Sequence, residues 1–475
     1  MNFIDRKKSL YKLLDSKIRK GIENREIILE FLTNQLMLSE FKNFQNHHHL
    51  NMQNFPNRAL LVGFKSGLNY FVRGSSVTLY AFLLTLFRVR NKKYSGVSPE
   101  ALIYALPIEL ISSINNMELE NFFDSQLFKL GFQPPNYYLV QSRSNIREDK
   151  KSRIIFERHI GAALLIYSHE SKLKVLSKLI RNYIQWIILC ISDPEMLTIG
   201  SEFIVDSLSF NKSSNLKLKY LITTQSTMLC LPTSFNFQDT PKKMMFWYSD
   251  NSRYIMPISS GKEVEFDYSY LTEGVIDFHI VWTKSWAKIL KKYTIGEVVV
   301  NGPVLFKNLE LIDSRHVQNN EKMKILVFDV TPQISLENCE HAYNLSNSVN
   351  FIDDIIEVSK KVSGKIEVYL KPKRNYTSSH SKSYIKYLSS RKKELNILSA
   401  NQDLAKLIMN YSLVIAIPFT STAIIAKYLK KEVIFYFPNV NYLLPKSYED
   451  IPIVIGMEEL KNYLNHCFLD YNHVK

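Results

Sequence analysis

Short apolar runs of strand length alternate with amphipathic segments through the second half of the chain. Strands are predicted at residues 325–329, 366–370, 395–398, 413–417 and 433–437, and helices at residues 352–362, 384–388, 404–409 and 424–429. Most of the strand segments are continuously apolar, which is typical of strands buried on both faces of a parallel sheet. Because strand and helix follow one another in turn, this half of the chain predicts a doubly wound α/β domain.

The first half predicts a helical region followed by a similar sheet. Two helices are expected within residues 1–50, and Ser98-Pro99-Glu100 predicts another helix through Leu102, Ile103 and Leu106. Residues 143–153 are expected to form a charged surface loop. Strands are predicted at 137–140, 203–205, 220–222, 244–248, 278–282 and 298–300, with an amphipathic helix at 173–191. The long segments between these strands indicate a second parallel sheet covered on both faces.

The length of 475 residues predicts two or three domains. The clearest break in the middle of the chain is Asn301-Gly302-Pro303. We therefore expect a mainly helical N-terminal region at residues 1–130 and two Rossmann-like domains at 131–305 and 306–475. These two domains should face a cleft, with ligands bound at the carboxyl ends of the strands.

Three consecutive hydroxyl residues follow the apolar strand predicted at 413–417. Pro418 breaks that strand, and Thr420, Ser421 and Thr422 then stand where the N-cap and first turn of the next helix must lie. Unpaired backbone N–H groups and the positive end of the helix suit a phosphate at such a corner. The ordinary alternative is a helix N-cap that binds nothing, for which one hydroxyl would be enough.

A cationic turn and an aromatic residue add to this candidate anion site. Lys371, Lys373 and Arg374 follow directly on the strand predicted at 366–370, where three cations could neutralise a diphosphate. A solvated turn is the alternative, but the hydroxyl corner at the same edge of the sheet favours a joint site. Tyr436 ends the following strand and could either stack on a nucleotide or pack in the core.

Polar residues beside the strands of the first half are candidate general bases. Asp250, Glu273, Asp277 and His279 each lie at or next to a predicted strand, and any of them could deprotonate a substrate from the cleft. A structural carboxylate or a core histidine is the alternative for each. We select His279 and Asp277 as the candidates.

Composition and short motifs limit which cellular compartment and which cofactors are expected. Four scattered cysteines without a CxxC pair favour a reducing cytosol over disulfides or zinc, and the first residues lack a signal peptide, so a cytoplasmic protein is expected. The tract His47-His48-His49 has no accompanying ligand cluster, so no metal site is expected there. Because the chain has no GxGxxG and no Walker loop, a dinucleotide-binding or P-loop enzyme is disfavoured.

The formal net charge of +15 favours polyanions, anionic lipid surfaces or phosphorylated substrates as partners. The apolar segments at 77–87 and 184–191 are shorter than a membrane span and have basic flanks. We expect both to be buried helices. The alternative is a helix that lies in the interface of an anionic membrane.

The segment Ile417-Pro418-Phe419-Thr420-Ser421-Thr422-Ala423 resembles the motif of the bacterial polysaccharide-biosynthesis PFTS-motif proteins. The blocks at 371–374 and 435–438 also match that family, as do 246–252, 281–283 and 299–305, so the resemblance covers roughly residues 223–456. Such proteins are similar to GT-B glycosyltransferases. The resemblance implies that the second domain binds a nucleotide-activated sugar and the first holds the acceptor. It also implies that Thr420, Ser421 and Thr422 form the phosphate-binding turn.

The leading hypothesis is a GT-B glycosyltransferase that transfers a sugar from a nucleotide donor to a glycan or lipid-linked acceptor of a cell-surface polysaccharide. Helix dipole and cations can stabilise the leaving phosphate, so no cofactor or metal is required, and no nucleic-acid partner is expected. Two alternatives remain, a nucleotide-sugar 2-epimerase and a non-catalytic partner docked on a membrane. The protein would be cytoplasmic, with a peripheral position on the inner face of the membrane as a variant of this hypothesis.

Overall fold

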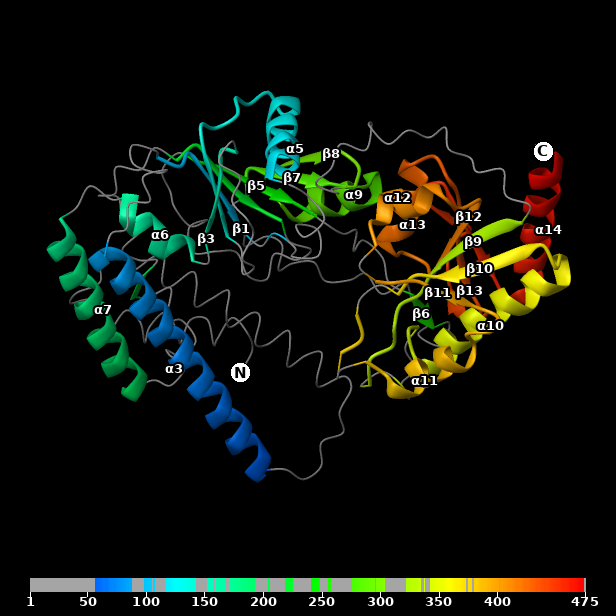
Figure 1. Cartoon of the computed structure of the whole chain (residues 1–475), viewed down its shortest axis with the longest axis horizontal. Helices are drawn as coiled ribbons and strands as arrows, with labels where there is room; N and C mark the ends of the chain where they lie inside the picture. The colour runs from blue at the N-terminus through cyan, green and yellow to red at the C-terminus, as the bar shows by residue number, and fades with distance from the viewer. Residues whose placement is uncertain are drawn as a thin grey trace. The chain divides into compact units, whose positions relative to one another are not determined.

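In a computed structural model, the chain splits into two compact units, and the breaks between them fall after Trp247, Asp267, Ile280, Leu290 and Val299. Each unit contains one large sheet (Figure 1). The structure describes residues 56–87, 98–104, 106, 116–141, 152–157, 159–167, 171–192, 204–205, 218–224, 241–247, 255–257, 276–294, 296–303, 322–334, 337, 342–372, 375–377, 380–400 and 402–473. The helices expected within residues 1–50 and the His47-His48-His49 tract lie outside this set.

The first sheet has seven strands in the order β3-β2-β1-β4-β5-β7-β8. They are β1 (Ala101–Tyr104), β2 (Tyr138–Gln141), β3 (Ile154–Glu157), β4 (Tyr220–Thr223), β5 (Lys242–Phe246), β7 (Phe278–Val281) and β8 (Glu297–Val300). Neighbours from β3 to β7 pair in parallel. Most of these strands were predicted, and all four side chains of β1 and of β4 are buried, as expected for a sheet covered on both faces.

Two predictions for this half are wrong. Residues Ala101–Tyr104 form the strand β1 between β2 and β4, although Ser98-Pro99-Glu100 predicted a helix there. The strand forms because its backbone pairs with β2 and β4 and its four side chains are buried on the two faces of the sheet. Local capping signals do not report such tertiary contacts. Ile204 and Val205 form no strand; they lie buried against the helices that follow β3.

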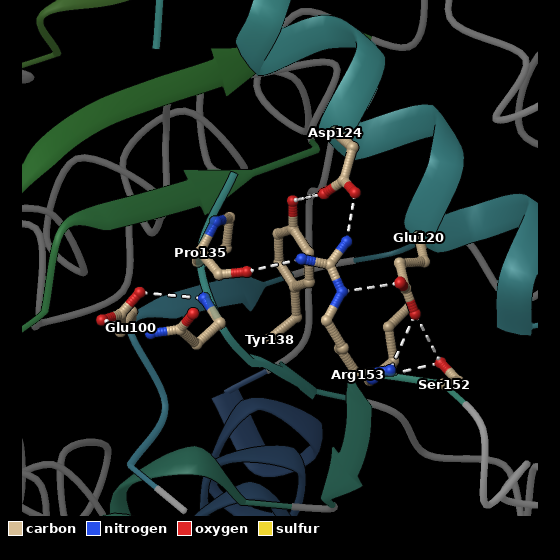
Figure 2. A network of polar contacts seen from close by, with 9 residues as sticks. Glu100, Glu120, Asp124, Pro135, Tyr138, Ser152 and Arg153 are labelled. Atoms are coloured by element: carbon tan, nitrogen blue, oxygen red, sulfur yellow. Dashed lines mark hydrogen bonds and ion pairs between the residues drawn. The ribbon is translucent and has the colours of Figure 1, made fainter. Parts of the chain in front are cut away.

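Helices and a polar network surround this sheet. The helices are α3 (Pro56–Phe87), α5 (Asn116–Lys129), α6 (Ile160–Tyr167) and α7 (Lys172–Ser192). The next described helix, α9 (Lys284–Tyr293), is divided between the two units, and its residues 284–290 belong to the second. Figure 2 shows how α5 is held at the amino ends of β2 and β3: Arg153 donates from Nε to Glu120 Oε1 at 2.7 Å and pairs with Asp124, which also accepts from the Tyr138 hydroxyl. Arg153, expected in a charged surface loop, is thus an ion-paired structural residue.

The second sheet has the order β11-β10-β9-β12-β13-β16-β15, in which only the edge strand β15 is antiparallel to its neighbour. The strands are β9 (Met323–Phe328), β10 (Ile366–Leu370), β11 (Asn396–Ile397), β12 (Leu413–Ala416), β13 (Glu432–Phe437), β15 (Ser447–Tyr448) and β16 (Ile451–Ile455). A separate two-residue ladder pairs β6 (Met256–Pro257) with β14 (Tyr442–Leu443).

The helices of the second unit are α10 (Leu345–Val362), α11 (Lys382–Ser390), α12 (Leu404–Met409), α13 (Ser421–Tyr428) and α14 (Met457–His473). One core cluster joins α10 and α14 to the sheet through Phe351, Ile355, Ile415, Tyr436 and Leu464. The prediction of two doubly wound α/β sheets is confirmed, whereas the boundaries 1–130, 131–305 and 306–475 and the cleft stay predictions. Among the described helices, none combines the length and the apolar character that crossing a bilayer requires.

Candidate anion-binding site at the second sheet

The order of the second sheet defines one edge at which a ligand can bind. The chain passes from β9 to β10 and β11 on one side, and then from β12 to β13 and β16 on the other. Ligands of such sheets bind beyond the carboxyl ends of the two central strands, where the direction reverses. Here those strands are β9 and β12, so Asp329 and the segment from Ile417 to Thr422 lie at this point.

The segment after β12 is a tight turn with an unusual backbone. Thr420 N donates to Ile417 O at 3.3 Å, which places Pro418 and Phe419 at the two central positions. Phe419 has φ of 64°, in the left-handed region that glycine usually occupies at the second central position of such a turn. Its ring packs edge-on against Tyr448, with ring centroids 5.3 Å apart. This packing holds a conformation that costs energy, as occurs at binding sites.

The hydroxyl corner, defined as Thr420, Ser421 and Thr422, begins helix α13. Thr420 is the N-cap residue, but its hydroxyl makes no capping bond; Oγ1 instead donates to Ile417 O at 2.9 Å. The first described bond of the helix runs from Ala423 N to Thr420 O, so the N–H groups of Ser421 and Thr422 precede the helical ladder. All three corner residues are half-buried, and no acidic residue stands in the first turn. The corner is therefore an accessible, positive helix end suited to an anion.

A buried lysine lies behind this edge, two strands away. Lys371 follows β10, is 6% exposed, and its Nζ donates to Ala400 O at 3.0 Å and to Pro372 O at 3.4 Å. Burial lowers the pKa of Lys371, and the negative charge of Asp329 partly opposes that shift. Since both ammonium bonds go to backbone carbonyls, Lys371 supports the turn after β10 and adds positive potential rather than presenting an exposed cation.

Asp329 is a charged member of this edge to which the sequence assigned no role. It directly follows β9, is 2% exposed, and its Oδ2 accepts from the hydroxyl of Tyr384 on α11 at 2.9 Å. The pKa of Tyr384 is raised, chiefly by burial and then by the charge of Asp329. Burial and the same carboxylate raise the pKa of Tyr376 to about 12. In the sequence, the signal that could have pointed to Asp329 was its position as a single acidic residue directly after an apolar strand.

The structure brings together only part of the predicted donor site. Pro418, the hydroxyl corner and Lys371 share the carboxyl edge of one sheet, while Lys373 and Arg374 lie outside the described residues. Tyr436 was predicted either to contact a nucleotide or to pack in the core, and the structure places it in the core. Its side chain is fully buried, its ring stacks on Phe351 with centroids 5.8 Å apart, and its hydroxyl donates to Asp354 Oδ2 at 2.5 Å. Tyr436 is therefore a core residue.

The two candidate bases of the first unit both accept hydrogen bonds from other residues of that unit. Asp277 precedes β7, so it stands at the amino edge of the sheet, and its Oδ2 accepts from Lys243 N at 2.8 Å. His279 lies within β7 without exposed surface, and its Nδ1 accepts from Trp247 Nε1 at 3.3 Å. Burial lowers the pKa of His279 to about 4. His279 is thus enclosed while Asp277 is half-buried, and a role of either side chain as general base stays a prediction. Asp250 and Glu273 lie outside the described residues.

Comparison with protein families gives one match. A family model described as "Polysaccharide biosynthesis PFTS motif protein" matches residues 184–464, which is more than half of the chain. A search of curated proteins found no match.

Solved structures give weak likenesses. The wall teichoic acid polymerase TagF is 10% identical with a TM-score of 0.40, over 83% of this chain and 88% of that one. WaaG, a glycosyltransferase involved in lipopolysaccharide biosynthesis, is 10% identical with a TM-score of 0.36, over 77% and 90%. The UDP-GlcNAc 2-epimerase of Methanocaldococcus jannaschii is 12% identical with a TM-score of 0.37, over 77% and 92%.

Proposed function

The chain belongs to the polysaccharide biosynthesis PFTS motif family, and on this premise we propose that it is a glycosyltransferase. It would transfer a sugar from a nucleotide-activated donor to a glycan or lipid-linked acceptor of a bacterial surface polysaccharide. A cytoplasmic location and a peripheral position at the membrane belong to the same proposal, supported by the cysteine usage and the net charge of +15.

The observation that carries this proposal is the uncapped, half-buried hydroxyl corner at the point where the second sheet reverses direction. When the bond between the anomeric carbon and the phosphate oxygen breaks, the diphosphate keeps the electron pair and its negative charge increases. The N–H groups and side-chain hydroxyls of Ser421 and Thr422 and the positive end of α13 would stabilise that charge, with Lys371 adding potential from behind. The acceptor oxygen forms the new bond to carbon, and its proton passes to solvent water.

The test is a variant that carries Thr420→Ala, Ser421→Ala and Thr422→Ala together. We expect the loss of nucleotide-sugar binding in calorimetry against a panel of nucleotide sugars, with an unchanged circular dichroism spectrum. The matched control is Ser389→Ala with Ser390→Ala on α11, two exposed serines whose hydroxyls bond only to backbone oxygens of their own helix. Unchanged binding by the triple variant would contradict the donor site.

The same preparation distinguishes the alternatives. A 2-epimerase would convert its nucleotide sugar without any acceptor, whereas a transferase needs a glycan or glycan lipid to release the nucleotide. Nucleotide-sugar binding without turnover on any extracted glycan lipid would favour the non-catalytic partner.

A further inference from the structure

Helix α7 carries an apolar stripe on the side that faces away from the protein. Its buried residues Val175, Leu179 and Trp186 pack against α3 and α6. About half a turn away from them lies a row spaced by three, four or seven residues along one helix face. Its members are between 49% and 82% exposed: Leu173, Ile180, Ile184, Ile188 and Ile191. A helix apolar on both sides is ordinarily buried on both.

Helix α3 lies beside α7 and carries a stripe of the same kind (Figure 1). Phe71 stacks on Trp186 with centroids 5.5 Å apart, and the hydroxyls of Ser75 and Tyr183 are 3.0 Å apart, so the two helices run antiparallel. The α3 stripe is 40% to 58% exposed and consists of Val72, Leu79, Leu83 and Leu86. Given these contacts, helical periodicity turns both stripes to the same side of the pair.

The helix pair is attached to the first sheet. The Tyr80 hydroxyl of α3 donates to Glu157 Oε2 at the end of β3, at 3.3 Å, and Ala81 and Ala162 belong to one buried cluster. The apolar side chains are therefore presented from a folded support. Contiguous exposed apolar surface of this kind usually marks an interaction site, because leaving it in water costs free energy.

The charged residues within the two helices are of one sign. Lys172, Lys174 and Arg181 are exposed on the first half of α7, and Arg73 is exposed on α3. Neither helix contains an Asp or Glu residue. Residues 1–55 of the chain also contain more Lys and Arg than Asp and Glu, so their net charge has the same sign as this basic flank. An apolar row with a basic flank matches a helix pair that lies on an anionic lipid surface.

We propose that the exposed face of α3 and α7 docks on an anionic membrane. The Ile and Leu side chains of the two stripes enter the boundary between headgroups and acyl chains, and Lys172, Lys174 and Arg181 contact lipid phosphates. This inference rests on the peripheral position included in the proposed function and deepens it by naming the surface and the lipid. It does not depend on sugar transfer, since its evidence lies in the first unit and not in the hydroxyl corner.

The test is sedimentation of the full-length protein with vesicles of phosphatidylcholine alone or mixed equally with phosphatidylglycerol. We expect binding only to the mixed vesicles, and binding that weakens as salt rises. The variant Ile184→Ser with Ile188→Ser should bind the mixed vesicles at least about tenfold more weakly. The variant Lys174→Glu with Arg181→Glu should lose about tenfold or more. All four positions are exposed, so the fold should be retained.

Matched controls lie in the second unit, where Val440→Ser removes an exposed apolar side chain and Lys392→Glu with Lys393→Glu reverses two exposed cations. Both should bind like the wild type. The proposal is overturned if the wild type ignores mixed vesicles, if the isoleucine variant binds them unchanged, or if that variant only converts a dimer to a monomer in light scattering. Nucleotide-sugar calorimetry on the same variants should be unchanged, which separates this outcome from failure of the donor site.

Discussion

The two sheets have the same strand order for their first five strands but differ at the edge where that order reverses. In the first sheet the edge is closed: Tyr104, Thr223 and Thr224 are buried, and Thr224 N donates to Tyr104 O at 3.2 Å across the two central strands. In the second sheet the half-buried hydroxyl corner starts a helix without a side-chain cap. The shared topology produces equivalent positions, and the residues after each strand decide whether an anion can bind there.

The connections from the third to the fourth strand differ as well. In the second sheet this connection spans residues 398–412 and contains the single described helix α12. In the first sheet it spans residues 158–219 and contains α6 and α7, which pack with α3. The longer connection supplies α7, one of the two helices whose apolar face is proposed to dock on membranes; the other helix, α3, precedes β1. One sheet thus carries the candidate chemistry and the other carries the candidate anchor.

The largest expected effect comes from placing a negative charge in the hydroxyl corner. Ser421→Asp should weaken nucleotide-sugar binding by about 100-fold or more, because a carboxylate would occupy the place of the phosphate. The same change should raise the stability of the protein by about 0.5 kcal/mol, since an acidic residue in the first turn favours the helix dipole. Calorimetry and thermal unfolding measure the two effects.

The uncharged control for this experiment is Ser421→Asn, which has nearly the same shape as the aspartate variant. It should keep most of the affinity. If the aspartate variant gains stability and binds as well as the wild type, α13 is an ordinary helix start and the contrast between the two edges is lost.

The next effect tests how completely the interior of the first sheet is buried, through His279 in β7. Its pKa is lowered to about 4 by burial, from an unfolded value of about 6.5. The unfolded chain therefore binds more protons between these values, and stability falls as the pH falls through this window. From pH 7 to pH 5 this one group should cost about 2 kcal/mol of the free energy of unfolding.

Urea unfolding followed by tryptophan fluorescence at both pH values measures this loss. His279→Gln keeps an acceptor for the Trp247 N–H without the titration, so its loss between pH 7 and pH 5 should be smaller by about the same 2 kcal/mol. An equal pH dependence in both proteins would mean that His279 is not buried in its neutral form.

The smallest effect compares one substitution at the two edges. Thr223 is fully buried, and its Oγ1 has no hydrogen-bond partner within the described part of the chain. Thr223→Val should therefore be neutral or stabilise the protein by up to about 1 kcal/mol. Thr420→Val removes the 2.9 Å bond to Ile417 O and should destabilise it by about 1 kcal/mol. Scanning calorimetry measures the sign of each change in stability. If both variants changed stability in the same direction, the proposed difference between the two edges would be contradicted.

The candidate site was predictable only in part. The hydroxyl corner follows a continuous apolar strand, so its place at a carboxyl edge could be inferred from order along the chain. Tyr436 and His279 lie inside strands buried on both faces, where the sequence pattern does not distinguish a side chain facing a ligand from one facing the core. The left-handed turn at Phe419 could not be anticipated, because phenylalanine rarely adopts it and the ring packing against Tyr448 that stabilises it comes from β15.

The sequence by itself determined the doubly wound class, the place of most strands and helices, and the hydroxyl corner. It did so because the hydrophobic effect has no preferred direction, so the spacing of apolar residues along the chain is enough to indicate which segments become buried strands and helices. Only the tertiary structure decided that Ala101–Tyr104 is a strand, that Asp329 bonds Tyr384 and that Arg153 joins α5. Hydrogen bonds and ion pairs are directional and act over about 3 Å, so they depend on which distant segments the fold brings together.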